Sequence, residues 1–119
     1  MKSLPFSHLK RLHQAADYKR LFATTDRLAS KHWVFIAAKN HLIYARLGLV
    51  VPKKHYTKAV SRNRIKRLIR ESFRHKQHDL QGLDIVVLAL KNIEVLSNIQ
   101  ISQSLNQQWE RLVLRKSAL

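Results

Sequence analysis

The chain has 119 residues, a length at which one domain buries about two-thirds of its unfolded surface, and 45% of them are hydrophobic. Its 23 Lys and Arg against 7 Asp and Glu give a formal net charge of +16, which favours a polyanionic partner and above all nucleic acid. The apolar content excludes a disordered basic tail, and the lack of cysteine excludes disulfides and thiolate metal sites.

Signals that would direct the chain to a membrane are missing from the sequence. No apolar stretch approaches the roughly 18–20 residues that span a bilayer, and the opening residues are not followed by the apolar core of a secretory signal. We therefore expect a cytoplasmic protein with no membrane partner. Residues 1–119 are expected to form a single nucleic-acid-binding domain, irregular over residues 1–12.

The first half of the chain is expected to hold one helix and two strands. Leucine and aromatic side chains at helical spacing predict a short amphipathic helix from about residue 15 to 23. Residues 32–39 and 43–51 are rich in aromatic and β-branched side chains, which predicts neighbouring strands joined as a hairpin. Strand alternation places Trp33 and Phe35 on one face, and we interpret both as core residues rather than as a platform for nucleotides.

A basic loop is expected over residues 52–57, because Pro52 cannot continue a central strand. A helix follows from about residue 58 to 77. Thr57 is a possible N-cap of this helix, and Gly82 lies just beyond its end.

The stretch from Ser61 to Arg74 is the most informative part of the sequence, because it combines six cations with a single anion and still keeps an apolar stripe. At about 100° per residue, the stripe is formed by Ser61, Ile65, Leu68, Ile69, Ser72 and Phe73. The opposite side carries Asn63, Lys66, Arg67, Arg70 and Arg74. A merely solvated face usually mixes cations with Glu in stabilising pairs, so this excess of cations favours phosphate binding.

The last third of the chain is expected to form a buried strand and a helix. Residues 83–90 are almost continuously apolar, as expected of a strand buried on both faces. A helix is expected from about residue 98, capped by Ser97 and with Trp109 in the core. With one further short strand in the first half, these segments give the order αβββαβα, which predicts an α+β two-layer sandwich with a mostly antiparallel, four-stranded central sheet.

The acidic and histidine residues give only weak evidence for a catalytic site in the protein. The seven acidic residues form no recognisable ligand motif for metal-assisted phosphodiester cleavage. His75, His78 and Asp79 come closest to a metal site, and we interpret them as a solvated helix end. We expect no catalytic residue and no metal site in the protein itself.

The sequence resembles the protein subunit of bacterial ribonuclease P. The run from Arg62 to Arg74 is similar to the family's signature, and so are three further segments. These are Asp17–Phe22, Arg46–Lys54 and Asp84–Lys91. The resemblance covers most of residues 17–91, and it implies a left-handed crossover between two parallel strands, where proteins in general have right-handed ones.

The resemblance implies that a catalytic RNA acts as an endonuclease and removes the 5′ leader of precursor tRNA. The RNA is expected to hold most of the Mg²⁺, and the protein is expected to assist and to take no small-molecule substrate. Contacts with the ribonuclease P RNA are carried over to Lys53, Lys54, Arg62, Asn63, Arg64, Lys66, Arg67 and Arg70. A cleft for the leader is carried over to Tyr18, Phe22, Ile36 and Lys91. Aromatic side chains with a basic rim suit a sequence-tolerant single-strand site.

Two alternatives stay open. A structural or ribosomal-type RNA-binding protein would carry the same charge, and a DNA-binding helix would present the same basic face, although the sequence lacks a compact helix-turn-helix pair. Tyr18 and Phe22 separate the first alternative from the family function. A leader-binding subunit needs these side chains for substrate affinity, whereas a scaffold protein needs them only for packing.

Overall fold

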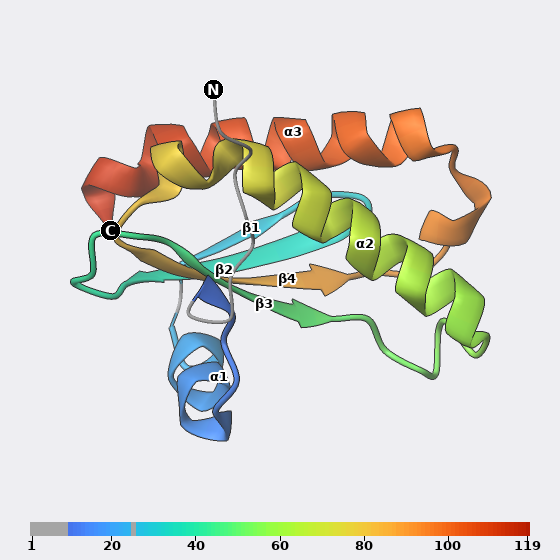
Figure 1. Ribbon diagram of the computed structural model, residues 1–119, viewed down its shortest axis with the longest axis horizontal. Coiled ribbons are helices and arrows are strands. Elements are labelled where there is room, and N and C mark those ends of the chain that lie inside the picture. The colour runs from blue at the N-terminus through green and yellow to red at the C-terminus, as the bar shows by residue number, and fades with distance from the viewer. Residues whose placement is uncertain (1–9, 25) are drawn as a thin grey trace.

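The computed structural model describes residues 10–24 and 26–119, so most of the segment predicted to be irregular lies outside the described residues. The elements follow the predicted order αβββαβα (Figure 1). They are α1 (Ala15–Phe22), β1 (Arg27–Ala29), β2 (Trp33–Lys39), β3 (Arg46–Val50), α2 (Ala59–Lys76), β4 (Leu83–Ala89) and α3 (Asn98–Arg115). Short 3₁₀ turns occupy Gln77–Leu80, Ile93–Val95 and Lys116–Ala118.

The four strands form one mixed sheet in the order β1-β2-β4-β3. β2 pairs antiparallel with β1 and β4, whereas β3 pairs parallel with β4. The predicted hairpin between β2 and β3 is therefore wrong, because β4 lies between them. Since β4 is apolar on both faces and buried along almost its whole length, it takes an inner position. The β3–α2–β4 unit is a parallel crossover, and its left-handed sense remains a prediction.

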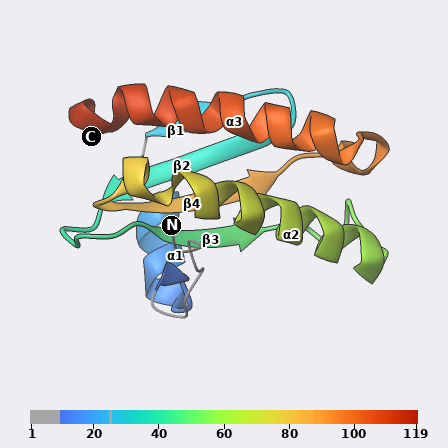
Figure 2. The same ribbon diagram turned by 45° about the horizontal axis from the view of Figure 1, so that its top comes forward.

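Helices α2 and α3 lie against one face of the sheet, and α1 lies on the other (Figures 1 and 2). The main core is on the side of α2 and α3, and it contains Trp33, Phe35 and Trp109 as predicted. The rings of Phe35 and Trp109 pack with their centroids 4.5 Å apart. The indole Nε1 of Trp109 donates a hydrogen bond to Ser72 Oγ at 2.7 Å, which joins α3 to α2 without leaving a buried donor unsatisfied. The predicted α+β fold is confirmed.

The helix ends agree with the sequence at α3 and differ at α2. Ser97 caps α3 as predicted, because its hydroxyl accepts from the Gln100 amide while the Gln100 side chain accepts from the Ser97 amide. The N-cap of α2 is Lys58, with no side-chain cap, so the predicted cap at Thr57 is wrong. The Thr57 carbonyl instead accepts a hydrogen bond from the Arg62 guanidinium at 3.0 Å. Helix α2 therefore begins without a side chain that accepts from its first amides.

Candidate nucleic-acid interface

Helix α2 separates an apolar face from a basic one as the sequence predicts. Ile65, Leu68, Ile69 and Phe73 are buried against the sheet and α3. On the opposite side Asn63 and Arg67 are exposed, while Lys66 and Arg70 are partly buried. The burial of one face holds the cations of the other in a fixed row, which suits binding to the phosphates of a nucleic acid.

Tyr56 anchors the loop before α2, and this fixes the backbone that carries the loop's lysines. The Tyr56 side chain is buried, and its hydroxyl donates to the Leu90 carbonyl and accepts from the Ile93 amide at 3.2 Å. Burial raises the pKa of Tyr56, and the hydrogen bond from Ile93 partly opposes this. Lys53 and Lys54 lie exposed on the same loop. The loop therefore presents two ammonium groups next to the start of α2.

Arg62 and Arg64 bind the protein itself as well as facing its surface. Arg62 Nη1 donates to the Tyr56 carbonyl at 2.8 Å and thereby ties the first turns of α2 to the loop. Arg64 donates to Asn98 Oδ1 at 2.9 Å and to the Leu96 carbonyl at 2.6 Å, next to the start of α3. A guanidinium has five N–H donors, so these bonds orient the two side chains and leave donors for a phosphate.

Tyr18 lies across β3 at a position that only glycine allows. A Cβ atom on Gly48 would come within 2.7 Å of Tyr18 Oη, closer than real Cβ atoms approach. The Tyr18 hydroxyl donates to the Leu12 carbonyl at 3.3 Å. Burial raises the pKa of Tyr18, an effect that the Leu49 backbone and the Arg70 charge partly offset. Gly48 thus permits an aromatic side chain from α1 to lie beside the start of the basic surface.

A hollow of about 220 Å³ joins the two predicted sites. Its lining residues come from the N-terminal segment, α1, β3 and α2, and they are Arg11, Leu12, His13, Tyr18, Leu47, Leu49, Lys66 and Arg70. Burial lowers the pKa of Arg70, and the nearby Arg11 lowers it further. Two cations in such proximity favour an anion between them. Lys66 and Arg70, expected on the catalytic-RNA side, therefore share a hollow with Tyr18 of the leader side.

The other residues expected in the leader cleft are dispersed. Phe22 is 38% exposed at the end of α1. Ile36 is 0% exposed and packs with Leu21 and Val86, so its side chain supports the sheet beneath α1 and presents no surface to a ligand. Lys91 is exposed and lines a separate hollow of about 370 Å³, which also includes Lys31, His32 and His55. Of the four predicted cleft residues, Tyr18 alone lies in the hollow beside α2.

Sequence reasoning missed a buried charge cluster that holds α1 in place. Asp84 of β4 is 0% exposed and accepts from Arg46 Nε at 2.8 Å, from Arg46 Nη2 at 2.7 Å and from Asn40 Nδ2 at 2.9 Å. It also forms an ion pair with Arg20 of α1. Burial raises the pKa of Asp84, but the hydrogen bonds from Arg46 and Asn40 and the charges of Arg46 and Arg20 together outweigh burial, so the net shift is downward. The one sequence signal was an acidic residue inside an otherwise apolar run.

Within residues 10–24 and 26–119 no three His, Cys, Asp or Glu side chains are grouped so that they could hold a metal ion. His75 lies 3.1 Å from the carboxylate of Glu71, one turn away on α2. No helix in this part of the chain is both long enough and apolar enough to cross a bilayer.

The sequence matches known proteins over almost its whole length. The family model described as Ribonuclease P matches residues 6–113. A ribonuclease P protein component of Nitrosococcus oceani is 44% identical over 113 residues, which are 95% of this chain and 95% of the relative. One from Pseudomonas aeruginosa is 45% identical over 114 residues, which are 95% of this chain and 84% of the relative.

Solved structures show the same fold. The ribonuclease P protein of Staphylococcus aureus is 33% identical, with a TM-score of 0.77 over 91% of this chain and 94% of that one. The ribonuclease P protein of Thermotoga maritima is 30% identical, with a TM-score of 0.74 over 85% of this chain and 96% of that one. Together with the basic face of α2, these matches show that the chain belongs to the ribonuclease P protein family, the protein subunits of an endoribonuclease holoenzyme.

Proposed function

We propose that this protein binds the ribonuclease P RNA and the 5′ leader of precursor tRNA, and so promotes endonucleolytic removal of the leader in the cytoplasm. The observation that carries the proposal is the hollow in which Tyr18 from α1 meets Lys66 and Arg70 from α2. An aromatic ring beside two cations suits one stacked base and its phosphate. Because the RNA carries the chemistry in this proposal, the protein does not need the catalytic carboxylates or metal ligands of a nuclease.

The catalytic RNA is expected to contact the loop over residues 52–57 and the outward face of α2. The exposed side chains of Lys53, Lys54, Asn63 and Arg67 are the primary contacts in this proposal. Arg62 and Arg64 contribute through the donors that they do not use within the protein. These cations neutralise phosphates, so the RNA needs less Mg²⁺ to fold and to bind its substrate. The Mg²⁺ ions themselves are held mainly by the RNA.

The leader is expected to run from the Lys66 and Arg70 hollow over Tyr18 and toward Phe22. Phe22 has enough exposed surface to stack on a base, whereas Ile36 does not. Lys91 faces a different hollow, and a leader that reaches it must pass beyond α1. A single strand of several nucleotides can bridge such separate contacts, because stacking and phosphate binding act independently along its length.

Cleavage of a precursor tRNA by a bacterial ribonuclease P RNA at low Mg²⁺ tests the proposal. The reaction is run without protein, with this protein, and with an unrelated protein of equal charge. We expect a mature 5′ end only with this protein. Activation equal to that by the unrelated protein would favour the structural RNA-binding alternative.

A second arm isolates the leader contact. Tyr18→Ala and Phe22→Ala are expected to weaken binding of the holoenzyme to a precursor with a long leader and to leave binding of mature tRNA unchanged. Stacking on each ring contributes on the order of 1–3 kcal/mol, so each variant should weaken precursor binding about tenfold. Equal losses for precursor and mature tRNA would remove the leader from this site.

A further inference from the structure

A large hollow lies at the opposite end of α2 from the loop over residues 52–57. It measures about 480 Å³ and forms where β2 ends, β4 begins and α3 passes into its terminal 3₁₀ turn. The residues that line it include Lys39, His41, Gly82, Leu83, Val113 and Lys116. None of these belongs to the interface described above. A ligand in this hollow would therefore occupy a different site from the nucleotide that we propose beside Tyr18.

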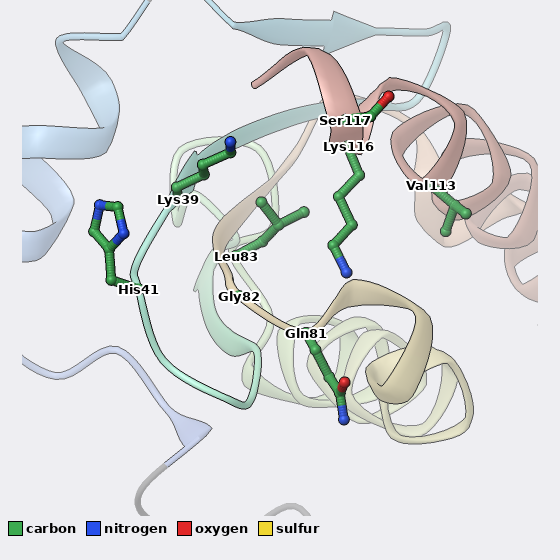
Figure 3. A pocket seen from close by; sticks show the side chains of 8 residues that line it. All are labelled: Lys39, His41, Gln81, Gly82, Leu83, Val113, Lys116 and Ser117. Carbon is green, nitrogen blue, oxygen red and sulfur yellow. The ribbon is translucent and has the colours of Figure 1, made fainter.

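The lining combines cations with an apolar floor. Lys39 and Lys116 lie on two sides of Leu83, and Lys116 extends toward the start of β4 (Figure 3). Leu83 and Val113 supply the apolar surface, and His41 adds an imidazole at the rim. Among the described residues none that lines the hollow is acidic. Two ammonium groups without a lining carboxylate favour an anionic ligand.

The rim is held in place by the backbone, so the hollow exists before a ligand arrives. The Asn40 amide donates to the Gly82 carbonyl at 2.9 Å, and the Gly82 amide donates to the Tyr44 carbonyl at 3.4 Å. His41 has a φ of 60° and Gly82 a φ of 84°. A non-glycine residue with positive φ is uncommon and persists only where its surroundings hold it. The connection from β2 to β3 and the start of β4 are thus locked together at this rim.

We infer that this hollow binds one nucleotide, with the phosphate between Lys39 and Lys116 and the base over Leu83 and Val113. The apolar floor suits a flat ring and gives little to a hydrated inorganic anion, whereas the lysines suit a phosphate and give little to a neutral nucleoside. The volume is within the range of about 300–1,000 Å³ that is usual for small-ligand sites. The nucleotide is either a free mononucleotide or one unit of a single-stranded RNA.

NMR titration of the full chain with 5′-AMP, adenosine and inorganic phosphate tests the inference. AMP is expected to shift the amide signals of Gly82 and Leu83 and the methyl signals of Val113, and to bind more tightly than either half alone. The double variant Lys39→Ala/Lys116→Ala should weaken AMP binding about tenfold or more, because two charged hydrogen bonds are lost.

The matched control is Lys19→Ala/Lys31→Ala, which removes the same charge from two exposed positions outside the hollow. It should leave AMP binding unchanged. Equal losses in the two double variants, or shifts spread over the whole basic surface, would overturn the inference and indicate charge attraction alone. A thermal melt of each variant checks that the fold is retained.

A short single-stranded RNA separates the two sources of the nucleotide. If RNA is the ligand, an oligonucleotide should produce the same shifts at lower concentration than AMP, and photo-crosslinks from 4-thiouridine should map to the segments around Lys39 and Lys116. If a free nucleotide is the ligand, AMP should produce the shifts and the oligonucleotide should fail to displace it. Binding of phosphate as tightly as AMP would refute a nucleotide site.

Discussion

Replacement of Asp84 by asparagine is expected to destabilise the protein strongly, although the side chain keeps its size. The carboxylate is fully buried and neutralised by Arg46 and Arg20. Breaking a buried ion pair costs roughly 3–5 kcal/mol, because the remaining charge has no partner. The Arg46 and Arg20 side chains are 24% and 43% exposed, so water recovers part of this loss. We therefore expect a loss of about 3 kcal/mol, a large share of a stability that is typically about 5–15 kcal/mol.

Urea denaturation at a series of pH values measures this effect. The folded-state pKa of Asp84 is lowered, so its contribution is complete at pH 7 and is lost as the pH falls through the ordinary aspartate value of about 3.9 and then through the lowered one. Asparagine does not titrate there, so the difference between the two proteins should shrink as the pH falls from 7 toward 3. The slope of the transition should stay the same in both.

Asp17→Asn serves as the matched control, because Asp17 lies 3.7 Å from Arg46 but keeps 23% of its side chain exposed. A partly exposed pair of this kind is worth less than about 1 kcal/mol. If Asp84→Asn costs no more than Asp17→Asn, or if its cost is the same at pH 7 and pH 3, the buried charge cluster does not stabilise the fold as argued.

Three further predictions concern the interface. Gly48→Ala should displace the Tyr18 ring and weaken binding of precursor tRNA more than binding of mature tRNA, which fluorescence titration with both RNAs would show; equal weakening would disprove the displacement. Arg67→Ala should lower affinity for the ribonuclease P RNA at unchanged stability, whereas Arg64→Ala should also cost about 1–3 kcal/mol in urea because it loses bonds to Asn98 and Leu96. Affinity for this RNA should fall with salt at a log–log slope of about −4 to −5, as expected for about six neutralised phosphates, and a slope near zero would contradict phosphate binding.

The apolar and basic faces of α2 could be predicted from the sequence because their signal is local. Cations on one side of a single helix and an apolar stripe on the other depend only on the 3.6-residue period, and Ile65 and Phe73 are buried as that period requires. The Ser97 cap is local in the same way, since it involves residues three positions apart. The almost continuous apolar run over residues 83–90 likewise predicted a strand that is buried on both faces.

The order of the strands could not be predicted from the same patterns. β2 and β3 are close in sequence and both rich in β-formers, so a hairpin was the simplest pairing, yet β4, which is apolar apart from Asp84, enters between them. The exposure of the predicted cleft residues could not be read from the sequence for a related reason. Alternation places Ile36 on the face toward α1, but only the packing of Leu21 and Val86 against it shows that its side chain is covered.

The sequence by itself determined that this is a basic α+β protein with one cationic helix face, because charge, apolar periodicity and the Ser97 cap are encoded in residues that are near neighbours in the chain. Tertiary structure alone decided that Tyr18 shares a hollow with Lys66 and Arg70, that Asp84 is the buried partner of Arg46 and Arg20, and that Lys39 and Lys116 flank a second hollow. The physical reason is that each of these sites joins residues from elements far apart in sequence, and their distances follow from sheet order and packing, which no local pattern specifies.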